Sequence, residues 1–220
     1  MQPMRYYELE AKGPRFVLPL MVMGSLILLG LGAAHYMEHH GHIVTGMNNQ
    51  IVWGTPHVFA IFLVVAASGA LNAASIASVF GQTAYKPLAR LSALTAIGLL
   101  VGGLIVLVLD LGRPDRLTVA MTTYNFKSIF AWNIFLYNGL LAIVAVYIWF
   151  MMEPKMRPYS KAAGYAAFIW RIILTTGTGA IFGFIVSREA YDSAIMSPLF
   201  VIMSFSYGSA VFLLDRKSVV

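Results

Sequence analysis

The chain has 220 residues, of which 59% are hydrophobic and 11% are charged, and it has a formal net charge of +6 and a mean hydropathy of +0.76. An ordinary soluble domain carries about 25% charged residues, so this composition indicates an integral membrane protein. The basic residues lie in short loops and give no support for nucleic-acid binding. Because cysteine is absent, the chain offers no disulfide, no thiolate metal site and no cysteine-ligated iron–sulfur cluster.

Six apolar runs follow one another, each of about 20 residues, which is the length that crosses a hydrocarbon core. They are Phe16–Tyr36, Pro56–Phe80, Leu88–Gly112, Ile129–Met152, Ala162–Ser187 and Met196–Leu214. The expected fold is therefore all-α, a polytopic bundle of transmembrane helices that makes a single membrane domain over residues 1–220. Residues 1–15 and 215–220 are expected to be short polar tails.

The lysines and arginines outside these runs are divided unequally between the two membrane surfaces. The side with fewer of them holds Arg113, Arg116, Lys127 and Arg188. The other side includes both termini, which the positive-inside rule then places in the cytoplasm. Residues 37–55 and 113–128 are accordingly predicted to face the periplasm.

Small residues spaced four apart predict close helix packing. Gly98 and Gly102 form such a pair in the third run, and Gly179 and Gly183 form another in the fifth. Polar side chains within the runs are expected to bridge helices through hydrogen bonds. These polar side chains are Asn72, Asn133 and Asn138.

Arg171 is a charged residue inside the fifth run. A long basic side chain can extend along apolar surface towards water, so the sequence predicts that Arg171 snorkels to the cytoplasmic interface.

All five histidines fall at the predicted periplasmic surface. His35, His39 and His42 follow a spacing that places metal ligands on one helical face, but Gly41 interrupts a helix there. A solvated histidine-rich loop is the preferred interpretation, and no metal site is predicted. Haem needs two facing axial ligands, and only His35 and His57 approach membrane depth, both at the end of a run. No haem is therefore predicted.

Two ionisable residues lie at the ends of neighbouring runs. His57 follows Pro56 at the start of the second run, where a positive helix end favours a neutral imidazole that can donate and accept hydrogen bonds. Asp110 closes the third run, where a carboxylate is costly unless it is paired or used. Arg113 is a candidate ion-pair partner, which leaves a salt-bridge anchor and a proton-handling group as open alternatives. A short loop joins the two runs, so His57 and Asp110 are expected to reach one pocket at the same surface.

Three stretches carry a resemblance to a known family. They are Gly46–Phe59, Leu109–Arg116 and Asn125–Trp132, with Trp-Gly-x-Pro, Asp-Leu-Gly-Arg-Pro and Ser-x-x-x-Trp elements. Together they resemble the NrfD / polysulfide-reductase membrane-subunit family, and within it the DsrP-type subunits of sulfur-metabolism complexes. The resemblance covers roughly residues 40 to 215.

The resemblance implies a haem-free membrane subunit of a respiratory or sulfur-metabolism redox complex in the cytoplasmic membrane of a bacterium or archaeon. Such a subunit exchanges electrons between a quinone, either menaquinone or ubiquinone, and a ferredoxin-like iron–sulfur subunit docked at the periplasmic face. Its quinone pocket is expected within a four-helix bundle formed by the second to fifth runs. Members of the family usually have eight to ten spans, more than this chain, which leaves a truncated subunit as an open interpretation.

A pocket for quinone chemistry needs hydrogen-bond donors for the carbonyl groups and a titratable group that leads to water. His57 is expected to hold one carbonyl and Asp110 to accept or pass a proton, while Trp53 and Tyr124 enclose the ring. The expected quinone-binding set is Asn49, Trp53, His57, Asp110, Arg113 and Tyr124, with Arg188 and Glu189 as a proton path. A passive membrane anchor and a small transporter remain as alternative functions.

Overall fold

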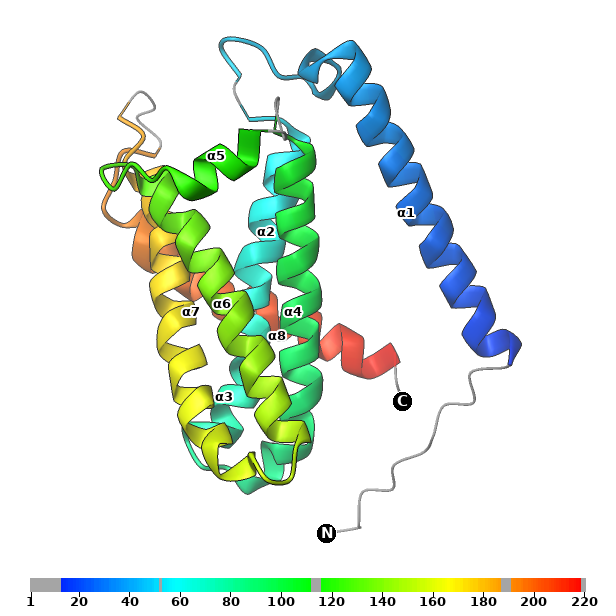
Figure 1. The fold of residues 1–220 in the computed structure, drawn as a ribbon, viewed down its shortest axis with the longest axis vertical. Coiled ribbons are helices and arrows are strands. Elements are labelled where there is room, and N and C mark those ends of the chain that lie inside the picture. Colours follow the sequence, from blue (N-terminus) through cyan, green and yellow to red (C-terminus); the bar gives the residue numbers. More distant parts are fainter. Residues whose placement is uncertain (1–12, 52, 112–115, 187–190, 219–220) are drawn as a thin grey trace. The chain divides into compact units, whose positions relative to one another are not determined.

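The structure is a computed structural model, and it describes residues 13–51, 53–111, 116–186 and 191–218. Every regular element in these ranges is a helix (Figure 1), which confirms the all-α prediction. Six helical segments are long and apolar enough to cross a membrane. The chain divides into two compact units, Met1–Val52 and Trp53–Val220. The expected single domain over residues 1–220 stays a prediction.

The first unit consists of α1, Pro14–His40, and a short 3-10 helix, His42–Thr45. Helix α1 ends at Gly41, whose φ of 80° lies in the left-handed region that favours glycine. Residues 37–40 were predicted to be loop, and this prediction is wrong because no residue before Gly41 breaks the helix. The rings of His35 and His39 therefore lie one turn apart on α1, with their centroids 4.5 Å apart.

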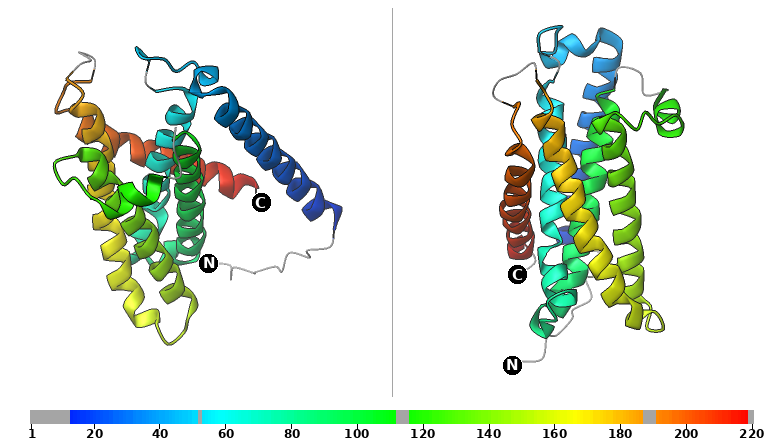
Figure 2. Two further views of the ribbon diagram at one scale, coloured as in Figure 1. Left: turned by 45° about the horizontal axis from the view of Figure 1, so that its top comes forward. Right: turned by 90° about the vertical axis from the view of Figure 1, so that its left-hand side faces the viewer.

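The second unit contains the remaining helices, whose arrangement is seen from two further directions in Figure 2. They are α2 (Thr55–Ala70), α3 (Asn72–Ser78), α4 (Lys86–Leu109), α5 (Leu117–Thr122), α6 (Ile129–Met152), α7 (Ser160–Gly183) and α8 (Met196–Ser218). Short 3-10 helices, Thr83–Tyr85 and Arg157–Tyr159, precede α4 and α7. The short helix α5 was not predicted from the sequence, because its six residues carry no clear periodicity.

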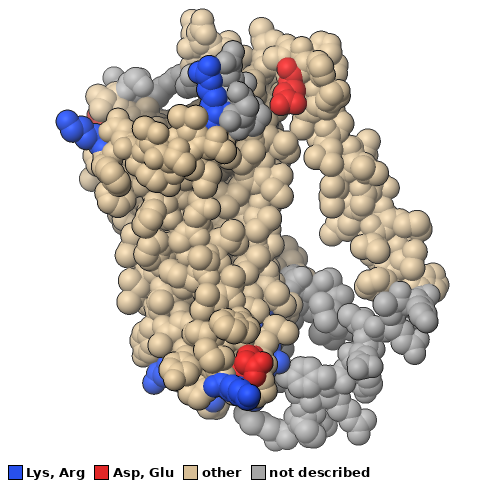
Figure 3. Space-filling view, viewed as in Figure 1, with Lys and Arg blue, Asp and Glu red and all other residues tan. Residues whose placement is uncertain are grey.

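The core of the second unit lies among α2 with α3, α4, α6 and α7, which form the expected four-helix bundle. Alanines on α2, α3 and α4 face larger side chains such as Leu140 and Leu174, so bulky groups from one pair of helices fill the space left by the other. Helix α8 packs outside the bundle, against α2 and α7. On the face of the bundle shown in Figure 3, charged side chains lie near the two ends, with an uncharged band between them. This distribution suits a bundle that spans a bilayer.

The second apolar run is interrupted at Leu71, where α2 gives way to α3. In a regular helix the Ala74 amide would bond to the Ala70 carbonyl. Here the Ser92 hydroxyl of α4 lies between them, donating to Ala70 O at 2.6 Å and accepting from Ala74 N at 3.1 Å. A side chain thus satisfies backbone groups that lipid could not. The sequence predicted one uninterrupted helix at this point.

Among the described glycines, Gly69 of α2 and Gly208 of α8 lie at the closest approach to a neighbouring helix. A Cβ atom on Gly69 of α2 would lie 1.7 Å from Ser204 O, and one on Gly208 of α8 would lie 2.1 Å from the Gly69 carbonyl carbon. Gly179 does lie at a close contact with α8, as its spacing suggested. Gly98 does not, because nothing lies within 4 Å of its would-be Cβ atom.

Two of the three asparagines in the spans bridge helices as predicted. Asn133 of α6 donates to Gly177 O of α7 at 3.1 Å, and Asn72 of α3 donates to Ser209 Oγ of α8 at 3.0 Å. The prediction is wrong for Asn138, which donates to Ile134 O within its own helix.

The prediction that Arg171 snorkels is also wrong. Arg171 is 1% exposed and lies halfway along α7. Its guanidinium donates a hydrogen bond to Ser68 O of α2 at 2.7 Å. Its hydrogen-bond acceptors lie inside the bundle, so extension towards water would leave them unsatisfied.

Candidate functional site

The site is built from the start of α2 and the end of α4. Pro56 occupies the first turn of α2, and His57 follows it. Helix α4 ends at Leu109, with Asp110 as its C-cap. The structure brings these two side chains together, with His57 Nδ1 2.5 Å from Asp110 Oδ2.

The two members of the pair differ in exposure. The side chain of Asp110 is 2% exposed and that of His57 is 25% exposed, so the imidazole covers the carboxylate. An ionised carboxylate can only accept hydrogen bonds, so Nδ1 then carries the hydrogen of a neutral ring. Because Nδ1 is buried against Asp110, Nε2 is the ring nitrogen that remains for a ligand. Its lone pair can accept a proton.

The helix ends explain why Asp110 turns towards α2. A carboxylate at the C-terminus of α4 is disfavoured by the negative end of that helix's own dipole. Contact with His57 in the first turn of α2 places the same carboxylate near a positive helix end. The pairing therefore offsets part of the cost of burying this charge.

The imidazole stacks on Trp53, which belongs to a larger group of aromatic side chains. The Trp53 ring lies nearly parallel to the His57 ring, with a centroid distance of 6.0 Å and an interplanar angle of 14°. Phe182 of α7 contacts Trp53 edge-on at 4.9 Å, and Tyr191 and Phe200 pack against Phe182 at 5.7 and 5.1 Å. We call Trp53, Phe182, Tyr191 and Phe200 the aromatic cluster.

Sequence reasoning named only Trp53 from this cluster. Phe182 closes α7, while Phe200 lies in the first turns of α8. Helices that alternate in direction bring these two positions to the membrane surface where His57 begins α2. Phe182 and Phe200 could therefore have been predicted from the sequence as aromatic residues at those ends of the apolar runs that reach the same membrane surface as His57.

Tyr124, which was predicted to enclose the quinone ring, has a ring contact with Phe126 in the segment between α5 and α6. Asn49 belongs to the first unit, so its role stays a prediction. Arg113, Arg188 and Glu189 lie outside the described residues. Within the described ranges, no three His, Cys, Asp or Glu side chains gather in a way that could hold a metal ion.

The third sequence motif closes the loop before α6. Asn125 Oδ1 accepts the Lys127 amide at 3.1 Å, and the Ser128 amide donates to Asn125 O at 2.9 Å. The Trp132 indole donates to Phe126 O at 2.9 Å. These contacts give Asn125–Trp132 a structural role.

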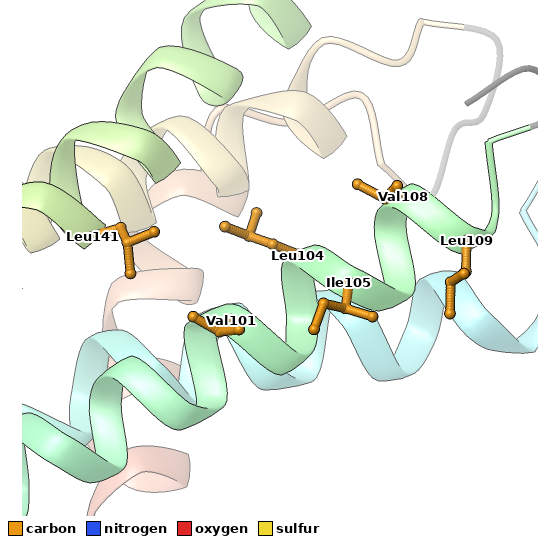
Figure 4. Close-up of a pocket in the computed structure, with 6 residues that line it drawn as sticks. All are labelled: Val101, Leu104, Ile105, Val108, Leu109 and Leu141. Atoms are coloured by element: carbon orange, nitrogen blue, oxygen red, sulfur yellow. The ribbon is translucent and has the colours of Figure 1, made fainter. Parts of the chain in front are cut away.

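Helix α4 also carries an apolar groove on another side (Figure 4). It is lined by Val101, Leu104, Ile105, Val108 and Leu109 of α4 and by Leu141 of α6. The 3.6-residue period places Asp110 on the side of α4 opposite Val101 and Val108. The groove is therefore separate from the His57–Asp110 pair.

The second unit thus has the architecture of a polytopic helical membrane protein, in which a buried carboxylate pairs with a partly exposed histidine where α2 begins. Residues 43–216 match the family described as polysulphide reductase, NrfD. The chain belongs to this family.

Three curated relatives cover most of the chain. It is 27% identical over 208 residues to the Hdr-like menaquinol oxidoreductase integral membrane subunit of Archaeoglobus fulgidus, covering 94% of this chain and 52% of the relative. It is 28% identical over 216 residues to a protein of Halobacterium salinarum assigned as a membrane subunit of dimethyl sulfoxide reductase, covering 88% and 49%. It is 20% identical over 230 residues to one of the subunits of selenate reductase in Mesobacillus selenatarsenatis, covering 87% and 54%. The chain thus spans about half the length of these relatives. No solved structure matches it.

Proposed function

We propose that the chain is a haem-free, quinol-interacting membrane subunit of a redox complex, and that His57 and Asp110 form its quinol site. The observation that carries this proposal is the buried carboxylate held 2.5 Å from a partly exposed imidazole. The names of the relatives, which are subunits of a menaquinol oxidoreductase and of reductases, support it.

The pair suits the chemistry of a hydroquinone, which loses two protons and two electrons when it becomes a quinone. His57 Nε2 would accept one hydroxyl proton, and Asp110 would stabilise the imidazolium that results. Once that proton has passed to water at the membrane surface, the same nitrogen would accept the second hydroxyl proton. The same ring could return the proton when a quinone is reduced. The sequence placed both groups at the quinone, with Asp110 as the proton acceptor; we now propose His57 for that role, because the side chain of Asp110 is 2% exposed and that of His57 is 25% exposed.

The two electrons would pass to a partner subunit, for which we propose a ferredoxin-like iron–sulfur protein. The quinol would be menaquinol or ubiquinol. We place the complex in the cytoplasmic membrane of a bacterium or archaeon, with the His57 surface facing the periplasm. The unequal distribution of lysine and arginine supports this orientation.

The orientation can be tested with an export reporter. A reporter that is active only outside the cytoplasm is expected to be active when fused after Gln50, and inactive when fused after Gln82, which follows α3. The opposite pattern would place His57 and Asp110 at the cytoplasmic surface.

A passive membrane anchor is the main alternative function. An anchor gains nothing from a carboxylate buried at the end of a membrane helix, since that group costs free energy in lipid. The His57–Asp110 pair therefore favours a chemical role over a purely structural one.

Quinol binding can be followed through the fluorescence of Trp53. A short-chain quinol analogue bound beside His57 should quench this indole, because the two rings already stack. His57→Ala removes a hydrogen-bond partner and is expected to weaken binding by about 1–3 kcal/mol. The measurement is a fluorescence titration of the full chain in detergent.

Trp53→Phe is the matched control, since it should abolish the quench while analogue binding, measured by equilibrium dialysis, persists. Equal binding by the wild type and His57→Ala would remove His57 from the site. The absence of any binding to the wild-type chain and to its assembled complex would favour the passive anchor.

A further inference from the structure

Arg171 is held at the centre of the bundle by three neighbouring helices. One terminal nitrogen of its guanidinium donates to Ser68 O of α2 and to Asn72 Oδ1 of α3, each at 2.7 Å. The guanidinium also lies 5.1 Å from the ring centroids of Phe168 of α7 and Phe205 of α8. These contacts fix the side chain where α2 gives way to α3.

The hydrogen-bond acceptors described for Arg171 are neutral. Both hydrogen-bond acceptors are uncharged oxygens, and no carboxylate in the described part of the chain forms an ion pair with it. A guanidinium keeps its proton in proteins. Among the described residues, the bundle therefore carries a full positive charge without a negative side chain paired to it, and little water can screen this charge because Arg171 is 1% exposed.

The depth of this charge is set by the helices around it. Arg171 lies halfway along α7, and its acceptor Ser68 lies 11 residues after His57. At 1.5 Å per residue, the charge is about 16 Å below the His57–Asp110 pair, near the middle of the membrane.

Buried polar groups lie on both sides of Arg171. Towards the His57 surface, Thr178 contacts Asn133 and Tyr137 at 3.4 and 3.5 Å. Towards the other surface, the Ser92 hydroxyl and the Tyr147 hydroxyl bond to the backbone of α2 and α3. Such groups can pass protons if water joins them, and Arg171 lies between the two sets.

We propose that Arg171 is an electrostatic barrier that prevents protons from crossing the bundle. A proton moving through the core would have to approach a fixed positive charge in surroundings of low dielectric constant. Protons handled at the His57–Asp110 pair would then be exchanged only with the membrane surface at which α2 begins. The barrier does not depend on whether quinol binds there.

The test is passive proton flow into liposomes that contain the full chain. An internal pH-sensitive dye reports the flow while a potassium diffusion potential drives it. Arg171→Gln removes the charge, and Asn72→Asp places a carboxylate beside it with almost no change in shape. Both variants are expected to raise the proton leak about tenfold over wild type, equivalent to a barrier lowered by 1.4 kcal/mol.

Two further variants separate charge from packing. Arg171→Lys keeps the positive charge and is expected to leave the leak at the wild-type rate. Ser209→Ala removes a hydrogen-bond partner of Asn72 without changing any charge. This variant is also expected to leak protons at the wild-type rate. If Arg171→Gln does not fold, Asn72→Asp decides the question, since it keeps the acceptor for the guanidinium.

The proposal is overturned if folded Asn72→Asp leaks no faster than wild type. It is equally overturned if Arg171→Lys or Ser209→Ala leaks as fast as Asn72→Asp, because loosened packing would then explain the flow. Quinol binding at His57, measured in the same preparations, should be unchanged in Ser209→Ala, which distinguishes failure of the barrier from failure of the quinol site.

Discussion

Asp110→Asn is expected to slow quinol oxidation by the assembled complex by about 10²–10⁴-fold, the range that a positioned proton acceptor contributes. The amide keeps the size of the carboxylate but loses its charge, so it cannot stabilise the imidazolium formed at His57. It can also present its NH₂ group to Nδ1, and this would move the ring hydrogen to Nε2 and leave no lone pair for the quinol proton.

The measurement is steady-state quinol oxidation with bound quinone quantified in parallel. Asp192→Asn is the matched control, because it makes the same chemical change at an exposed carboxylate, and it should keep wild-type turnover. The double variant His57→Gln with Asp110→Asn should be no slower than the slower single variant, since the two groups act as one unit. Wild-type turnover in an intact Asp110→Asn complex would reduce Asp110 to a salt-bridge anchor.

Gly208→Ala is expected to loosen α8 from the bundle at a cost of about 3 kcal/mol, the upper part of the usual range for overpacking. The added Cβ atom would lie 2.1 Å from the Gly69 carbonyl carbon and 2.2 Å from the Ala70 nitrogen. Backbone atoms cannot rotate away as a flexible side chain can, so the whole helix must move.

Gly98→Ala is the matched control, because its added methyl group meets nothing within 4 Å. An alanine in a helix interior is favoured over glycine by about 1 kcal/mol, so this variant should be as stable as wild type or slightly more stable. The measurement is thermal unfolding of the purified chain in detergent, with protease cleavage of α8 as a second readout. Equal stability of the two variants would mean that α8 does not pack against α2 as described.

The apolar run lengths predicted the membrane spans well, because lipid allows few alternatives to a helix of the right length. The interruption at Leu71 could not be predicted in this way. Leu71 and Asn72 are ordinary helix residues by composition, and the break depends on the Ser92 hydroxyl, which reaches α3 from another helix. Hydropathy carries no information about such a partner.

The approach of His57 to Asp110 was predictable, since a short loop returns α4 to the surface where α2 begins. The sequence could not predict which of the two side chains is more exposed. The exposed fractions, 25% for His57 and 2% for Asp110, are determined by packing. The position of the Arg171 side chain also depends on contacts that the sequence does not reveal. Its charge was visible in the sequence, but its acceptors on α2 and α3 were not, and those acceptors keep it away from the interface.

The Ser92 hydroxyl between Ala70 and Ala74 has a mechanical consequence. A continuous helix transmits a tilt along its whole length as a stiff rod does. Here the segment that carries His57 ends at the joint, and the two main-chain groups on either side of that joint are tied to α4 instead of to each other. A small tilt of α2 during exchange of a ligand at His57 can be absorbed at Leu71, leaving α3 and the opposite end of the bundle at rest.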